Sequence, residues 1–302
     1  MLARLTVVAL VAFTSLASAQ VAPPAFEKKG DAKDVDKIED VTWAAKGELG
    51  IIASTGNART TTVTASANAL RKDKDNKLEL TLLGTYARAT TRTAVDANGD
   101  GVIDATELDT ATATSAENAS GKLRYDRYLT AADSLYASAQ LATDVLAGKD
   151  VVAELQAGYS RGLYKDRCQE LLGEVGYDFT YVNLAAGSSS TIHSGRLFGG
   201  YKAKVGSTTQ VEASLEALLN GNTVTYGMRE AGPLKANRLN GTVGVVTALS
   251  KKLSLNASFN AKYDQFPAPL AKIGGIPFAA GFEPPAEKLD TLTKISLIFQ
   301  FL

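Results

Sequence analysis

The chain has 302 residues, of which 45% are hydrophobic and 21% are charged, a balance typical of a folded protein rather than a disordered one. Its 32 basic and 32 acidic residues leave no net charge, which argues against nucleic acid as a partner. One cysteine and one histidine exclude a disulfide framework, a cysteine-rich zinc site and a histidine-cluster metal centre, and no apolar run is long enough for a helical membrane span.

Residues 1–19 predict a secretory signal peptide. Arg4 supplies the positive charge, residues 5–16 form the apolar run, and residues 17–19 (ASA) form a small-residue cleavage site. The run is too short to span a bilayer, so we expect cleavage after Ala19 and export from the cytoplasm. The alternative is a buried N-terminal helix. Residues 20–42, which contain KKGDAKDVDKIED, predict a polar periplasmic segment.

From residue 43 onward, apolar and polar residues alternate with the period of two that is typical of β-strands. At 253–263, for example, Leu255 and Phe259 fall on one face and Asn256 on the other. We expect the apolar face of every strand to fall on odd-numbered residues. The pattern predicts about twelve strands, near residues 43–54, 59–71, 77–90, 115–129, 134–146, 150–163, 168–182, 191–204, 208–219, 237–249, 252–266 and 290–302.

The connections between these strands alternate in length. Tight turns are expected at 72–76, 130–133, 164–167, 205–208 and 249–252, and longer connections at 91–114, 183–190, 220–236 and 267–289. Two further connections, 55–58 and 147–150, are short exceptions. Short turns on one rim and long loops on the other are typical of outer-membrane barrels, whose short turns lie in the periplasm. The sequence therefore predicts an all-β fold, an antiparallel transmembrane β-barrel over residues 43–302 in the bacterial outer membrane.

A soluble β-sandwich also alternates, and two features favour the barrel over it. The polar face is unusually charged, whereas the opposite face carries almost no charge, as a surface in contact with lipid requires. The charged residues are Glu48, Glu79, Lys122, Arg124, Asp126, Glu154, Glu170, Glu174, Asp178, Arg196, Lys202, Glu212, Glu216, Arg238, Lys262 and Asp264. We expect Glu170, Glu174 and Asp178 to pair with Arg196 and Lys202 on adjacent strands.

Aromatic residues of the apolar face form the second feature, because they gather at strand ends as two girdles. The expected periplasmic girdle is Trp43, Tyr125, Tyr159, Tyr201, Phe299 and Phe301, and the expected outer girdle is Tyr86, Tyr177, Tyr181 and Tyr263. The last segment, TLTKISLIFQFL, resembles the C-terminal strand that barrel-insertion machinery reads, although Leu302 follows the terminal aromatic Phe301. Outer-membrane lipid and that machinery are therefore the expected partners.

The start of the predicted barrel resembles an uncharacterised family of outer-membrane barrels, the domain of unknown function that includes the salt-induced outer-membrane protein. The resemblance rests on Trp43, the turn at 54–57 (STGN), a threonine-rich second strand and a third strand ending Tyr86-Ala87-Arg88. It covers most of residues 43–302 and implies an outer-membrane barrel. The family supplies no defined reaction and no catalytic residues.

Residues 96–107, DANGDGVIDATE, match the calcium loop of an EF-hand. Such a loop needs oxygen ligands at alternating positions and glycine at the sixth, which is Gly101 here. The predicted Ca²⁺ ligands are Asp96, Asn98, Asp100, the carbonyl of Val102, Asp104 and Glu107. Thr-rich flanks argue against full EF-hand helices, so we expect weak binding, about 10⁻⁴–10⁻³ M, that orders a surface loop. The alternative is a solvated acidic loop without an ion.

No catalytic constellation emerges from the sequence. A hydrolase of the barrel class needs a nucleophile beside a base, and the odd positions near His193 offer no serine. Cys168 lacks a second cysteine and receives no redox role. We therefore expect a structural barrel, or a narrow, salt-bridged and nearly closed pore for small solutes, rather than an enzyme. A calcium-dependent surface adhesin, acting through 91–114 and 267–289, and a barrel enzyme are the alternatives.

Overall fold

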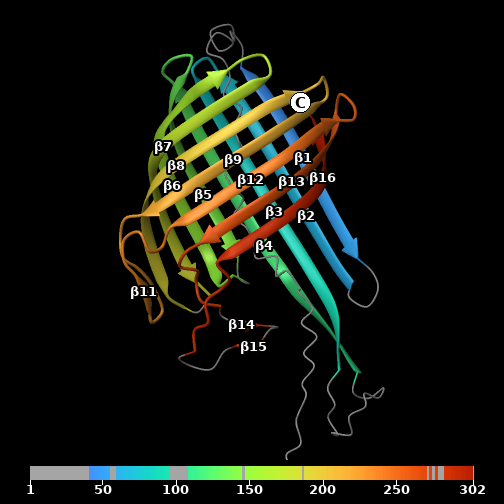
Figure 1. Ribbon diagram of the computed structural model, residues 1–302, viewed down its shortest axis with the longest axis vertical. Helices are drawn as coiled ribbons and strands as arrows, with labels where there is room; N and C mark the ends of the chain where they lie inside the picture. The colour runs from blue at the N-terminus through green and yellow to red at the C-terminus, as the bar shows by residue number, and fades with distance from the viewer. Residues whose placement is uncertain are drawn as a thin grey trace, which may run out of the picture.

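The computed structural model describes residues 41–54, 59–94, 108–144, 147–185, 187–270, 272–273, 276–277 and 282–301. Twelve antiparallel strands close into a barrel in the order β1-β16-β13-β12-β9-β8-β7-β6-β5-β4-β3-β2 (Figure 1). The strands are β1 (Thr42–Ser54), β2 (Arg59–Asp73), β3 (Asn76–Ala94), β4 (Leu108–Tyr128), β5 (Asp133–Asp144), β6 (Lys149–Lys165), β7 (Gln169–Leu184), β8 (Ser189–Val205), β9 (Thr209–Asn220), β12 (Arg238–Ala248), β13 (Leu253–Asp264) and β16 (Leu289–Gln300). The predicted fold and strand positions are confirmed. In the described part of the chain, no helix has the length and hydropathy of a membrane span.

Short turns gather at one end of the barrel, which we call the short-turn rim. The start of β1 and the end of β16 lie side by side there, since Lys46 pairs with Gln300 and Phe301 N donates to Ala45 O at 2.9 Å. In the turn after β6, the Asp166 carboxylate accepts hydrogen bonds from the amides of Cys168 and Gln169 at 2.7 and 2.6 Å. These bonds, of which the one from the Cys168 amide has the largest effect, stabilise the ionised carboxylate and hold the pKa of Asp166 below its usual value.

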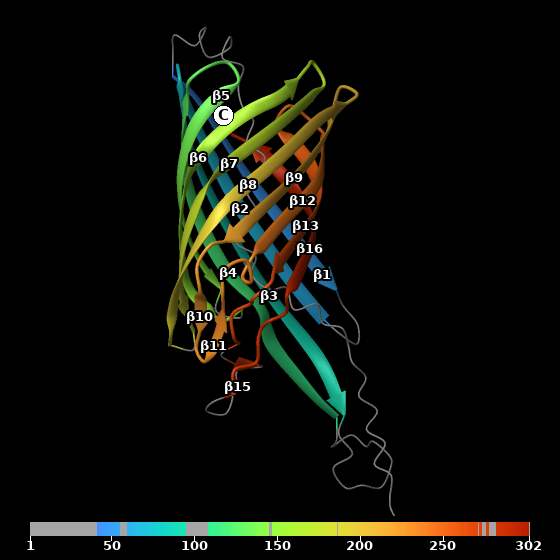
Figure 2. The same cartoon turned by 60° about the vertical axis from the view of Figure 1, so that its left-hand side comes forward.

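The opposite end, the long-loop rim, holds structure that the sequence did not predict. Inside the connections treated as loops lie two small hairpins, β10 (Val224–Tyr226) with β11 (Arg229–Ala231), and β14 (Lys272–Ile273) with β15 (Ile276–Pro277). Strands β3 and β4 also reach further than expected and stay paired as far as Ala94 and Leu108. Figure 2 shows this pair projecting beyond the other strands.

The expectation that every apolar face falls on odd numbers is wrong for β3. The turn Lys74–Asp75 is only two residues long, so Asp73 pairs directly with Asn76 and odd residues of β2 face even residues of β3. Because Lys77 pairs with Asp126, the odd-numbered residues of β4 again lie on the outer face. On β3 the exposed apolar side chains are therefore even-numbered, namely Leu78, Leu80, Leu82 and Tyr86.

Apolar side chains cover the outside of the barrel, as predicted, and aromatic residues lie near its rims. Trp43 and Phe301 are 62% and 65% exposed at the short-turn rim, and Tyr177 is 48% exposed toward the other. Phenol groups of the short-turn girdle bind polar strand ends, because Tyr125 Oη donates to Asn76 at 2.6 Å and Tyr201 Oη donates to Gln169 at 3.0 Å. Rings in an apolar surface with hydroxyls at its edge are typical of a membrane interface.

Candidate functional site: the lumen of the barrel

The middle of the lumen is filled by a network of paired charges, which we call the Glu174 network. Glu174 accepts from Arg124 Nη2 and from Arg196 Nη1, each at 2.7 Å. Arg196 Nε also binds Glu216 at 2.6 Å, and Arg124 Nη2 binds Asp126 at 2.8 Å. All five side chains are buried, with Arg196 only 1% exposed. Alternating charges with charge-assisted hydrogen bonds allow these groups to remain ionised away from water.

Two glycines make room for this network. Arg124 lies on β4 and Glu174 on β7, so their contact passes over β5 and β6. Tyr136, Gly158, Gly176 and Arg196 form one row across β5 to β8. The Tyr136 ring occupies the space over the glycines. A Cβ at either glycine would collide with Tyr136 Oη, so the ring depends on the absence of both side chains. Its hydroxyl then accepts from Arg196 Nη1 at 2.8 Å, and the ring centroid lies 4.3 Å from the Arg124 guanidinium carbon.

A second ionic contact crosses the lumen closer to the long-loop rim. Arg238 of β12 reaches Asp178 of β7, with Nη2 at 2.8 Å from the carboxylate, and Thr180 Oγ1 accepts from the same nitrogen at 3.0 Å. Gln156 donates to Asp178 at 3.1 Å. Asp178 is fully buried, and Arg238 Nε has no hydrogen-bond partner among the described residues. The lumen is therefore spanned by side chains at two levels.

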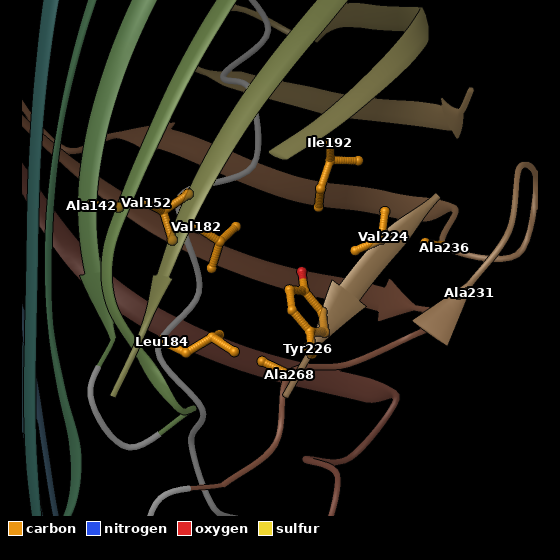
Figure 3. Close-up of a cluster of buried hydrophobic side chains, with 10 residues drawn as sticks. All are labelled: Ala142, Val152, Val182, Leu184, Ile192, Val224, Tyr226, Ala231, Ala236 and Ala268. Carbon is orange, nitrogen blue, oxygen red and sulfur yellow. The ribbon is translucent and has the colours of Figure 1, made fainter. Parts of the chain in front are cut away.

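The long-loop end of the lumen is filled by apolar side chains, which we call the plug (Figure 3). The hairpin β10–β11 folds inward and places Tyr226 among inward-facing residues of the barrel wall. The Tyr226 ring stacks on Phe266 at a centroid distance of 5.4 Å, and Arg229 covers the Phe266 ring at 4.6 Å. The buried members are Ala142, Val152, Val182, Leu184, Ile192, Val224, Tyr226, Ala231, Ala236 and Ala268.

Among the described residues, one cavity lies inside the barrel on each side of the Glu174 network. A vestibule of about 410 Å³ opens at the short-turn rim and is lined by both signs of charge, including Lys46, Glu48, Lys77, Glu79, Lys202, Glu212 and Lys252. A cavity of about 30 Å³ lies beneath the plug, bounded by Tyr226, Arg238 and Asp264 among others. The smaller cavity has room for about two or three water molecules, since one water needs about 10–15 Å³ of such volume.

The six predicted calcium ligands, Asp96, Asn98, Asp100, Val102, Asp104 and Glu107, lie outside the described residues, as do the signal peptide and residues 20–40. Among residues that are described, no group of three or more His, Cys, Asp or Glu side chains is arranged to hold a metal ion. The calcium loop therefore stays a prediction from the sequence.

The expected ion pairs are partly confirmed. Glu174 binds Arg196 as predicted, but Asp178 binds Arg238, which is three strands away, and Lys202 binds Glu212 at 2.7 Å. Adjacent-strand reasoning missed the Asp178–Arg238 contact because long side chains in a narrow barrel reach beyond their neighbours, whereas Lys202 pairs with Glu212 directly across the adjacent strand β9. The signal that was available was the pair of inward glycines, Gly158 and Gly176, which opens space along one row.

His193 takes part in an aromatic cluster on the outer face. Its Nδ1 hydrogen bonds with Tyr177 Oη, and its ring packs edge-on against Phe179 at a centroid distance of 5.2 Å. Its backbone amide donates to Asn222 at 2.8 Å. These contacts anchor the outer girdle. Cys168 is exposed in a turn of the short-turn rim, with a free thiol.

Comparison with known proteins places most of the chain in one family. Residues 47–301 match the family described as "Protein of unknown function, DUF481". No curated protein matches the chain.

Several solved structures resemble the barrel. An outer membrane channel from Pseudomonas putida F1 has 12% identity and a TM-score of 0.43, with 93% of this chain and 100% of that chain covered. The NanC porin has 8% identity and a TM-score of 0.41, with 86% and 100% covered. An anion-selective porin from Comamonas acidovorans has 11% identity and a TM-score of 0.37, with 87% and 100% covered.

Proposed function

The chain belongs to the family of proteins of unknown function that its residues 47–301 match, and we propose that it is an outer-membrane β-barrel protein with a closed resting lumen. It serves as a structural barrel or as a narrow pore for small solutes. The uncharged outer face with aromatic rims supports a place in a membrane, since a soluble protein rarely exposes so continuous an apolar surface. Export, insertion machinery and lipid partners belong to the same proposal.

The observation that carries the closed lumen is the burial of the Glu174 network. Arg124, Glu174, Arg196 and Glu216 point into the barrel, yet none is more than 6% exposed. An open channel would wet these charges. Passage of a solute therefore requires them to part, and because both signs line the route the pore would have little ion selectivity.

Membrane fractionation with a heat-modifiability gel tests the location. We expect the protein in the outer-membrane fraction, with a folded band that shifts on boiling. A water-soluble monomer would overturn the proposal.

Planar-bilayer recording tests the lumen, and we expect no steady conductance from the resting barrel. A large, constant conductance would show that the lumen is open and that only the membrane location holds.

We also propose that residues 96–107 bind Ca²⁺ at the cell surface. The support is the sequence pattern together with the projecting β3–β4 pair, whose last paired residues are Ala94 and Leu108. Four carboxylates, the side-chain amide oxygen of Asn98 and the backbone carbonyl of Val102 suit this hard ion. Such a site pins a long connection beyond the long-loop rim, which is a structural role rather than a sensory one.

Calorimetric titration of the detergent-solubilised barrel with CaCl₂ tests the loop. We expect one site with a dissociation constant of about 10⁻⁴–10⁻³ M. Glu107→Gln removes the bidentate ligand and should abolish the heat, whereas the control Asp109→Asn, just outside the loop, should leave it. Equal heats from both variants, or none from the wild type at millimolar Ca²⁺, would contradict the proposal.

A further inference from the structure

The seam between β1 and β16 closes the barrel less completely than any other strand pair. Four residue pairs are in register, from Lys46 with Gln300 to Leu49 with Leu297. Next in length is β9 with β12, which has ten pairs, and the longest, β3 with β4, has nineteen. Strand length does not explain the difference, because β1 has 13 residues and β16 has 12.

The ladder stops halfway along the seam. Beyond Leu49, residues 50–54 of β1 remain paired with β2, and residues 289–296 of β16 remain paired with β13. Among the described residues these two stretches share no pairs with each other. Figure 1 shows β1 on the right-hand side of the barrel and β16 crossing its front face. Two backbone edges therefore meet without a ladder in the half nearer the long-loop rim.

An edge of this kind is costly in hydrocarbon, where each unpaired backbone group costs several kcal/mol. Barrels span membranes because closure removes such edges. Parting of the other strand pairs would break long ladders, but parting of this half-seam breaks no ladder hydrogen bonds. If the barrel opens sideways, it opens here.

The outer and inner faces of the half-seam differ in chemistry. Outward-facing Ile51 and Ile295 are 62% and 60% exposed and would meet lipid tails. A gap of about 10 Å³ behind them is lined by Gly50, Thr62, Thr64 and residues 292–295. Gly50 permits close approach on both sides of β1, since a Cβ there would lie 2.5 Å from Thr64 Oγ1 on β2 and 3.3 Å from the Ile295 carbonyl oxygen on β16.

An ion pair separates the gap from the vestibule, because Lys294 lines the gap and binds Glu48. Glu48 lines that vestibule and is held by Lys294 at 2.8 Å and by Asn256 at 2.8 Å. A path from the short-turn rim through the vestibule, past this ion pair, and out between β1 and β16 would therefore need only the gap of about 10 Å³ to widen. The path avoids both the Glu174 network and the plug.

We propose that the β1–β16 half-seam is a lateral opening through which a single-chain amphiphile passes between the vestibule and the membrane. Its hydrocarbon chain lies in the parted seam, and its polar head lies beside Glu48 and Lys294. The gap is narrow, with apolar side chains on its outer side and charged side chains at its inner end. This favours an amphiphile with one hydrocarbon chain over a two-chain lipid or a fully hydrated solute. This inference rests on the proposed membrane location and deepens it by naming a class of ligand and a route.

The test uses the refolded full barrel in phospholipid vesicles with a diazirine-bearing palmitate as the probe. In a Cys168→Ser background, Ile51→Cys with Ile295→Cys places two thiols that would be opposite each other if the ladder continued past Leu49 and Leu297. The matched control is Val243→Cys with Phe259→Cys, outward residues already paired between β12 and β13. After illumination, mass spectrometry maps the adducts.

We expect adducts on inward-facing Thr64 or Leu292 in the reduced seam variant, at least tenfold fewer after oxidation, and recovery with dithiothreitol. Oxidation of the control pair should change nothing. Adducts confined to outward residues, or inward adducts that persist in the oxidised seam variant, would overturn the lateral route.

Hydrogen–deuterium exchange of the wild-type barrel provides a second measurement that needs no variant. The amides of residues 50–54 and 289–295 that point into the half-seam, which are every second one, should exchange at least tenfold faster than amides of residues 241–247 in β12, whereas the intervening amides remain bonded to β2 or β13. Equal protection would overturn the proposal even if the thiols fail to join. A heat-modifiable membrane barrel with a protected seam refutes the lateral opening alone, whereas a soluble protein refutes the proposed function as well.

Discussion

The Glu174 network and the plug fill neighbouring levels of one lumen with opposite kinds of side chain. The network holds because each carboxylate has a guanidinium, as Glu174 has Arg124 and Arg196. The plug holds because apolar surface, including the Tyr226 ring, is removed from water. Removing one member of a buried ionic set strands its partners, whereas removing one apolar side chain leaves a cavity that neighbours can partly fill. The two regions should therefore respond differently to truncation.

The largest effect is expected for Glu174→Ala. It leaves two buried guanidinium groups without their shared carboxylate, and breaking such a contact lowers the free energy of unfolding by about 3–5 kcal/mol. Urea unfolding in vesicles, followed by Trp43 fluorescence, measures the loss. The control Glu212→Ala breaks the more exposed Lys202 pair, with side-chain exposures of 16% and 30%, and should cost about 0–1 kcal/mol. Similar losses for both variants would contradict the special role of burial.

Tyr226→Ala should come next, with a loss of about 3 kcal/mol from the cavity left in the plug. Tyr226 is 2% exposed, whereas Met228 in the same hairpin is 73% exposed and gives the control Met228→Ala, expected within about 0.5 kcal/mol of wild type. The same unfolding assay applies. A loss for Tyr226→Ala larger than that of Glu174→Ala would reverse the comparison between the two fillings.

Gly176→Ala tests how the network is seated and should have the smallest effect. Its new Cβ would strike both Tyr136 Oη and the backbone oxygen of Ala157, so the ring must move away from Arg196 and the neighbouring strand must shift, at a cost of about 1–3 kcal/mol. Gly195→Ala, where nothing lies within 4 Å of the added Cβ, is the matched control. Equal unfolding free energies for the two variants would show that Tyr136 does not depend on the glycine row.

The sequence was sufficient for the barrel wall but not for what fills it. Alternation and turn composition located all twelve barrel strands, because a wall with lipid outside and charge inside repeats every second residue. The prediction of odd-numbered apolar residues failed at β3, because the two-residue turn Lys74–Asp75 places the even-numbered residues of β3 on the outer face. Alternation also missed β10 and β11, which have three residues each and are too short to show a period.

Contacts inside the lumen were harder to predict for a geometric reason. The Glu174–Arg196 pair joins adjacent strands and was expected, but Arg124 reaches Glu174 over two intervening strands. That reach depends on the absence of side chains at Gly158 and Gly176 and on the flat position of Tyr136 above them. Such positions follow from the curvature of the closed wall, which no single strand encodes.

The short β1–β16 ladder joins the two ends of the barrel sequence at the same rim. A circular permutant is therefore feasible, with residues 41 and 301 connected by a short linker and new termini between Lys74 and Asp75. In that molecule β1 and β16 would be covalently tethered, and β2 and β3 would become the strands that meet last. Whether the weak joint stays with its residues or moves to the new chain ends would separate a property of the amino acids from a consequence of connectivity.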